Sequence, residues 1–129
     1  EAIRLIHHGV DCFGFRVYHP ATGPWGVISD TALFPELFSF FAGCRILVIN
    51  VTLQEKSEQL DHLSLEEARE IVAKTNPELA LITHMGMRIL ERGPSHLICT
   101  EAFSTNTLPA EDGMMVDLRE SRIVESVNF

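Results

Sequence analysis

The sequence is poor in cysteine and contains no long apolar run. Its three cysteines, Cys12, Cys44 and Cys99, are an odd number without a Cys-x-x-Cys pair. Neither a disulfide framework nor a cysteine zinc cluster is therefore predicted. We expect the three cysteines to be small, buried hydrophobic side chains. No run approaches the ~18 uncharged apolar residues of a membrane span, and the first residues lack a signal-peptide layout. We therefore expect a soluble, cytoplasmic protein without a membrane partner.

Basic residues are also scarce. The 129 residues contain 10 Lys and Arg against 18 Asp and Glu, which gives a net charge of −8 and no basic run. Because neutralising phosphates requires clustered Lys and Arg, nucleic acid is not an expected partner. The acidity is compatible with a divalent-cation site, although diffuse charge is more typical of a solvated surface. The apolar fraction of 46% is sufficient for the core of one domain, or of part of a larger one.

The clearest local signal is a helix followed by a strand. Ser64 is followed three residues later by Glu67, a capping-box pattern that predicts a helix from about Leu65. Asn76-Pro77 ends this helix, because proline restricts the residue before it. The apolar run 79–82 then has the length of a buried strand.

Two histidines flank this helix and strand. His62 lies in the loop before the helix, and His84 comes directly after the strand with Gly86 close behind. Open α/β sheets place ligands at the carboxyl ends of their strands. We therefore expect His62 and His84 to reach the same end of a sheet, although a lone histidine at such a position is more often structural.

The other predicted elements alternate between strands and helices, which indicates α/β layering. They are a hairpin of strands 13–18 and 27–28, a helix from Thr31 to Gly43, a strand at 45–51, a short helix at 85–91, a possible strand at 96–99, and a last strand at 114–118 before a polar tail. Six phenylalanines are expected in the core: Phe13, Phe15, Phe34, Phe38, Phe40 and Phe41.

The hairpin is bordered by polar residues. His7 and His8 precede its first strand, and Asp30 follows its second. In an antiparallel pair the start of one strand lies beside the end of the next, so His8 and Asp30 are predicted neighbours.

Imidazole nitrogens and a carboxylate oxygen suit zinc, iron or manganese, and a carboxylate can bridge two such ions. The segments that carry these residues resemble the metallo-β-lactamase superfamily over nearly the whole chain. The resemblance rests on His-Gly-Val-Asp-Cys-Phe-Gly-Phe-Arg-Val from His8, Ile-Ser-Asp-Thr around Asp30, Leu-Ile-Thr-His-Met-Gly-Met around His84, and Ala-Glu-Asp-Gly-Met from Ala110. Within the superfamily, the sequence is most similar to the phosphodiesterase branch that includes the RNase Z enzymes.

This resemblance implies a dinuclear metal site. His8 and His84 would each bind one ion, Asp30 would bridge them, and His62 would be a general acid or electrostatic stabiliser. Assignment of His8 rather than His7 rests on its six-residue offset from Gly14. Two divalent ions, zinc with manganese or iron as alternatives, would generate a hydroxide that attacks a small phosphodiester, or less expectedly an ester, thioester or lactam.

The superfamily's His-x-His-x-Asp-His motif is absent from these residues. Residues 1–129 therefore resemble the C-terminal half of an αββα metallo-β-lactamase sandwich, an α/β fold with one mixed sheet and helices on one face. Its inner face would be apolar and uncovered, so the expected partner is the N-terminal half of the fold or a second copy. The chain alone should bind metal weakly and be inactive. The alternative is a non-catalytic interaction module or relic half-domain.

Overall fold

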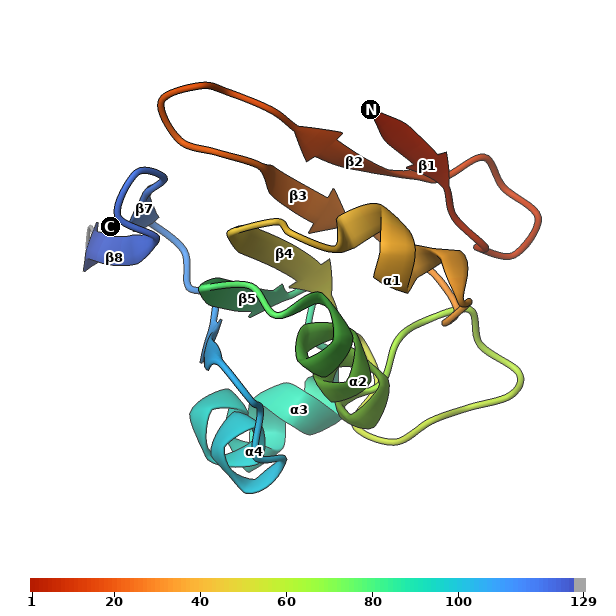
Figure 1. Cartoon of the computed structure of the whole chain (residues 1–129). Coiled ribbons are helices and arrows are strands. Elements are labelled where there is room, and N and C mark those ends of the chain that lie inside the picture. Colours follow the sequence, from red (N-terminus) through yellow and green to blue (C-terminus); the bar gives the residue numbers. More distant parts are fainter. Residues whose placement is uncertain (127–129) are drawn as a thin grey trace.

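The computed structural model describes residues 1–126, which form a mixed sheet, a small second sheet and short helices (Figure 1). The strands are β1 (Ala2–Arg4), β2 (Phe13–Val17), β3 (Trp25–Ile28), β4 (Ile46–Asn50), β5 (Leu79–Thr83), β6 (Asn106–Pro109), β7 (Met114–Asp117) and β8 (Arg122–Ser126). The helices are α1 (Glu36–Phe41), α2 (Leu65–Thr75), α3 (Met87–Arg92) and α4 (Pro94–Thr100). The predicted polar tail lies partly outside the described residues.

The main sheet has the order β1-β2-β3-β4-β5-β6. β1, β2 and β3 pair antiparallel, as the predicted hairpin requires. β3, β4, β5 and β6 run parallel to one another. The carboxyl ends of four neighbouring strands therefore lie at one edge of the sheet, and this edge positions the candidate site.

α2 forms as its sequence predicts. The Ser64 hydroxyl accepts a hydrogen bond from the N–H of Glu67 at 3.3 Å, and the Glu67 carboxylate accepts one from the N–H of Ser64 at 2.9 Å. The helix ends at Asn76, whose left-handed backbone satisfies a carbonyl of the last turn before Pro77. Leu65, Ala68, Ile71 and Val72 are buried in the core.

The helices cover one face of the main sheet. Ile28, Leu47, Ile49, Ala80 and Ile82 point to this face and are fully buried with the helices. The fold class is thus the predicted α/β arrangement, with a mixed sheet and its helical layer on one side.

The opposite face is covered only in part. The β7–β8 hairpin packs on Ile46 and Leu81, and Figure 1 shows it apart from the helices. Phe15 and Val27, paired across β2 and β3, lie on this face beyond the hairpin. Phe13 and Phe15 remain 52% and 39% exposed, so the prediction that both are core residues is wrong for the described chain.

Two predicted elements differ from the structure. The helix expected from Thr31 begins only at Glu36, because the Thr31 hydroxyl accepts from the Ile6 N–H and donates to the Ala32 carbonyl, and Pro35 disfavours helical backbone before it. The strand expected at 96–99 is part of helix α4, which has Pro94 in its first turn. A short apolar run in the sequence does not by itself distinguish a buried strand from a helix.

Three strands were not predicted from the sequence: β1, β6 and β8. β1 and β6 are short, at three and four residues. β6 ends in Pro109, which is tolerated because β6 is an edge strand.

The three cysteines are free, as predicted. Cys44 is buried and Cys12 is half-buried, but Cys99 is exposed, which corrects the expectation of three buried thiols. Among the described residues, no helix is long and apolar enough to cross a membrane.

Candidate metal centre

Asp30 and His84 meet at the carboxyl edge of the parallel strands. Asp30 follows β3 and His84 follows β5, with β4 between them. The His84 Nδ1 lies 3.1 Å from the Asp30 Oδ1, and Asn50, the last residue of β4, donates its side-chain N–H to the same oxygen at 3.1 Å. The Thr52 hydroxyl lies 3.0 Å from the His84 Nδ1. Strand order therefore brings together residues that are far apart in sequence.

His62 joins this pair from the loop before α2. Backbone hydrogen bonds between Leu53 and both Leu63 and Leu65 hold that loop against the end of β4. The His62 Nδ1 lies 3.8 Å from the Asp30 Oδ1, and the ring stacks on that of His84 with centroids 6.2 Å apart. This Nδ1 is buried without a hydrogen-bond partner.

Burial sets the protonation of His62. Its side chain is 18% exposed, and this desolvation lowers the pKa of His62 below its usual value. Asp30 opposes the shift, whereas His7, His8 and His84 reinforce it through like-charge repulsion. His62 is therefore neutral at pH 7 and offers one lone pair and one N–H.

His7 and His8 stand beside His62 in a tight turn. The Val10 N–H donates to the His7 carbonyl at 2.9 Å, and both central residues, His8 and Gly9, have positive φ values of 47° and 71°. This is the pattern of a type I′ turn. The ring centroid of His62 lies 5.0 Å from that of His7 and 5.8 Å from that of His8.

Asp61 ties this turn to the loop that carries His62. Its carboxylate accepts a hydrogen bond from the His8 N–H at 2.6 Å and lies 3.7 Å from the His8 Nδ1. Its backbone carbonyl lies 3.2 Å from the His7 Nδ1 and can only accept, so this bond requires a proton on that nitrogen. One residue thus contacts both neighbouring histidines.

Two of the histidines occupy unusual backbone conformations. His8 and His84 have φ values of 47° and 55°, in the left-handed region that non-glycine residues rarely adopt. Such conformations persist where the surrounding structure fixes them, and they occur often at functional sites. His8 lies in the turn between β1 and β2 and His84 directly after β5, and the ring of each lies near that of His62.

Candidate ligand atoms form two overlapping groups. One contains Asp30, His62 and His84, and the other contains His7, His8 and His62; within each group the ligand atoms lie within 4.8 Å of one another. The structure therefore brings His62 together with Asp30 and His84, as expected for one end of a sheet. For His8, the neighbouring carboxylate is that of Asp61, whereas Asp30 faces His62, His84 and Asn50.

The donor set fits a transition-metal ion. Imidazole and carboxylate groups are common ligands of zinc, iron and manganese. The buried His62 Nδ1 has no hydrogen-bond partner in the protein, and a bound ion nearby would account for such an unsatisfied polar atom. A cleft of about 180 Å³ borders the cluster and is lined in part by Asp61, His62 and Glu67.

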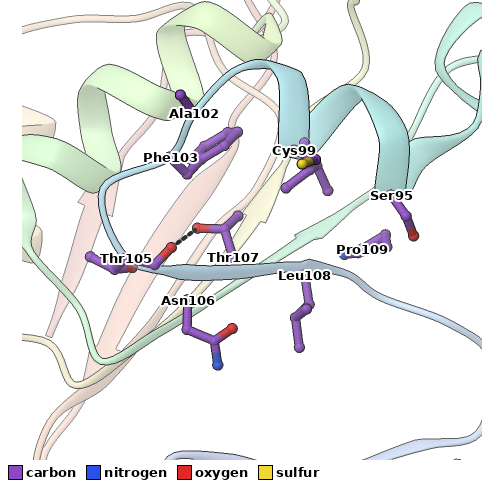
Figure 2. A pocket seen from close by; sticks show the side chains of 10 residues that line it. Ser95, Cys99, Ala102, Phe103, Thr105, Asn106, Thr107, Leu108 and Pro109 are labelled. Carbon is purple, nitrogen blue, oxygen red and sulfur yellow. Dashed lines mark hydrogen bonds between the residues drawn. The ribbon is translucent and has the colours of Figure 1, made fainter.

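A second depression lies away from the histidines, between α4 and β6. It measures about 430 Å³, and Figure 2 shows Ser95 and Cys99 on one wall and the β6 residues on the other. The Thr107 hydroxyl donates to the Thr105 carbonyl within it at 3.2 Å. Since its lining contains no histidine or carboxylate, it offers none of the ligands of the histidine cluster.

Three polar residues of the centre were not identified in the sequence: Asn50, Thr52 and Asp61. Asn50 had a signal, because it is a polar residue at the carboxyl end of a predicted buried strand. Asp61 directly precedes His62. Its contact with His8 depends on a long-range approach of two loops.

Comparisons with known proteins agree with this architecture. Uncharacterized protein MJ1374 of Methanocaldococcus jannaschii is 32% identical over 111 residues, which are 81% of this chain and 40% of that protein. The metallo-beta-lactamase fold protein YhfI from Bacillus subtilis superposes with a TM-score of 0.72 at 18% identity, over 85% of this chain and 45% of YhfI. The short form of human tRNase Z, ELAC1, gives a TM-score of 0.63 at 17% identity, over 98% of this chain and 42% of that chain.

These similarities define the fold. Over the part that it covers, the chain has the metallo-β-lactamase fold. The chain spans less than half the length of each of these three proteins. No protein-family model matches the chain.

Proposed function

We propose that this chain supplies part of the active site of a metal-dependent hydrolase that cleaves a small phosphodiester. His8, Asp30 and His84 would hold the divalent ions, and His62 would assist the departing oxygen. The observation that carries this proposal is the meeting of Asp30, His62 and His84 at the carboxyl edge of the sheet.

The metal ions would lower the pKa of a water molecule and stabilise charge that develops on the phosphate oxygens; zinc fits the imidazole-rich donor set, as do manganese and iron. The residues of the chain orient this chemistry. Asn50 and His84 hold the Asp30 carboxylate at its Oδ1, which leaves the second oxygen free to bind. Neutral His62 presents one N–H as a hydrogen-bond donor to the departing oxygen.

The choice of a phosphodiester rests on similarity. The chain resembles a tRNase Z over nearly its whole length, and its sequence motifs resemble those of the phosphodiesterase branch. Esters, thioesters and lactams are the competing substrate classes. The net charge of −8 argues against a large polyanionic substrate for this segment.

Hydrolysis of bis(p-nitrophenyl) phosphate tests the proposal. The 129-residue chain should show negligible turnover with Zn²⁺ or Mn²⁺, whereas the whole product of its gene should be active. Asp30→Asn and His84→Ala should abolish that activity, and His96→Ala, which changes an exposed histidine on α4, should not. Full activity of Asp30→Asn, or cleavage of esters or lactams alone, would contradict the proposal.

We also propose that the open face of the sheet packs against a second sheet from the part of the fold that this chain does not cover. Phe13 and Phe15 are exposed on this face, and the matched proteins are more than twice as long as the matched region. Both rings are already about half buried, so covering their remaining surface would contribute roughly 1–3 kcal/mol in total, since fully burying one large apolar side chain is worth about 1.5–3 kcal/mol. The same exposed face also fits the alternative, a non-catalytic module that binds a partner through this face. In that case the partner could be a second copy of the chain.

Thiol labelling of Phe15→Cys in a Cys99→Ser background distinguishes these occupants. The introduced thiol should react rapidly in the chain alone and be protected in the whole gene product. Val124→Cys, on β8 and 50% exposed before substitution, is the control. Protection in the chain alone, together with a dimeric mass, would identify a second copy as the occupant and overturn the proposal.

A further inference from the structure

We infer that a cleft beside the candidate metal centre, between residues 52–60 and 86–88, binds an apolar or aromatic group that is esterified to the substrate phosphate. The inference rests on the proposed function for the phosphodiester, and it adds the part of the site that selects among phosphodiesters. None of the residues proposed to hold the metal ions or to assist the departing oxygen lines this cleft.

Thr52 joins the cleft to the metal centre. Its hydroxyl lies 3.0 Å from the His84 Nδ1, and its backbone carbonyl accepts a hydrogen bond from the Gly86 N–H at 3.1 Å. Thr52 and Gly86 both line the cleft, whose volume is about 480 Å³. Sites for small molecules typically measure about 300–1,000 Å³. A substrate whose phosphate reaches His84 can therefore place one of its ester groups in this cleft.

Two exposed apolar side chains from separate segments line the cleft. Met87, the first residue of α3, is 65% exposed, and Leu60, in the loop before α2, is 45% exposed. Single apolar side chains at a protein surface are ordinary, but two that line one concave site together with polar groups are typical of ligand sites. The flexible thioether of methionine also packs well against aromatic rings. An apolar or aromatic ester group in the cleft would remove both side chains from water.

The charge of the cleft suits a phosphodiester. Its lining contains two cations, Lys56 and Arg88, and one carboxylate, Glu55, so the lining has a net charge of +1 in a chain whose net charge is −8. A phosphodiester carries one negative charge. Lys56 pairs with Glu58 at 3.3 Å, but both side chains are exposed, and such pairs are weak enough for a substrate anion to compete. The cleft therefore favours a small monoanion with an apolar group over a long polyanion, which the rest of the chain repels.

Diphenyl phosphate and dimethyl phosphate test the inference, because both are singly charged phosphodiesters and they differ only in their ester groups. Methionine-methyl NMR of the whole gene product, freed of metal with EDTA, follows binding without turnover. The signal of Met87, assigned by its loss in Met87→Leu, should shift with diphenyl phosphate. The signal of Met115, assigned in the same way, is the internal control, because Met115 is 52% exposed on β7 and does not line the cleft.

Variants separate the apolar and the charged contributions to binding. Diphenyl phosphate should bind at least about 10-fold more tightly than dimethyl phosphate. Leu60→Ser should weaken the binding of diphenyl phosphate by about 3–10-fold and leave that of dimethyl phosphate unchanged. Arg88→Gln should weaken the binding of both esters by about 2–5-fold. Arg122→Gln, which changes an exposed arginine on β8, should affect neither.

Three outcomes overturn the inference. These are a Met87 signal that diphenyl phosphate leaves unchanged, equal shifts of the Met87 and Met115 signals, and equal affinities of wild type and Leu60→Ser for diphenyl phosphate. Cleavage of bis(p-nitrophenyl) phosphate without the NMR effects would refute the cleft and leave the hydrolase proposal standing. The NMR effects without any phosphodiesterase activity would support the cleft and refute the hydrolase proposal.

Discussion

The carboxylate of Asp61 accepts a hydrogen bond from the backbone N–H of His8 at 2.6 Å, although the two residues are 53 positions apart in the sequence. The bond joins the turn at His7 and His8 to the loop that carries His62. It also places the Asp61 carboxylate 3.7 Å from the His8 imidazole. Asp61 therefore positions His8 without needing to bind an ion itself.

Replacing Asp61 by Ala should weaken metal binding by about 10–100-fold, because the His8 turn loses its anchor and its ring loses a neighbouring carboxylate. Co²⁺ titration measures the affinity. Glu58→Ala is the matched control, since Glu58 lies on the same loop and pairs only with Lys56 among the described residues. Equal affinities for wild type and Asp61→Ala would show that Asp61 does not position His8.

Gly86 lies where no side chain fits. A Cβ at Gly86 would stand 2.3 Å from the Thr52 carbonyl oxygen, a backbone atom that the Gly86 N–H itself contacts at 3.1 Å. Gly86→Ala should therefore destabilise the chain by about 1–3 kcal/mol. Because Thr52 also contacts His84, the NMR signals of the His84 ring should shift. An unchanged free energy of unfolding in urea would refute this account.

The capping box of α2 should be worth a measurable amount of stability. Ser64→Ala removes the acceptor for the Glu67 N–H and leaves a buried carboxylate with a less ordered partner. We expect a loss of about 0.5–2 kcal/mol in the free energy of unfolding. Ser39→Ala is the control, because the Ser39 hydroxyl only donates to a carbonyl of its own exposed turn. The prediction fails if the two variants are equally stable.

The ion pair between Arg45 and Glu78 should make stability depend on acid pH. Hydrogen bonding to Arg45 lowers the pKa of Glu78 below its usual value of 4.5. A carboxylate with a lower pKa in the folded state stabilises the fold above the unfolded pKa, and this contribution is lost as the pH falls through the lowered value. Since Glu78 is 55% exposed, the effect should stay below about 1 kcal/mol.

Glu78→Gln tests this prediction through urea unfolding measured from neutral to strongly acid pH. The variant should be less stable than wild type at neutral pH, and the difference should vanish in acid. Arg45 also donates to the Thr22 and Arg119 carbonyls at 2.6 and 2.8 Å, so Arg45→Ala should cost more than Glu78→Gln. A stability difference between Glu78→Gln and wild type that is constant with pH would exclude the linkage.

Local sequence patterns predicted helix α2, strand β5 and the chemical types of the site residues. The capping box gave the start of α2, Asn76-Pro77 gave its end, and the apolar run after it gave β5. These features can be predicted from the sequence because each depends on residues that are close together in the chain. The start of α1 was misplaced where a long-range contact intervened, since the Thr31 hydroxyl binds the Ile6 backbone instead of capping a helix.

Which ligand candidates meet depends on strand order and loop packing. Parallel pairing of β3, β4 and β5 brings Asp30, Asn50 and His84 to one edge, and the packing of two loops places Asp61 against His8. These residues come from segments that are widely separated in the chain, so no local pattern encodes their distances. The same holds for the open face of the sheet. Alternation in β2 places Phe13 and Phe15 on one face, but their partial exposure follows from the arrangement of the helices and the β7–β8 hairpin among the described residues.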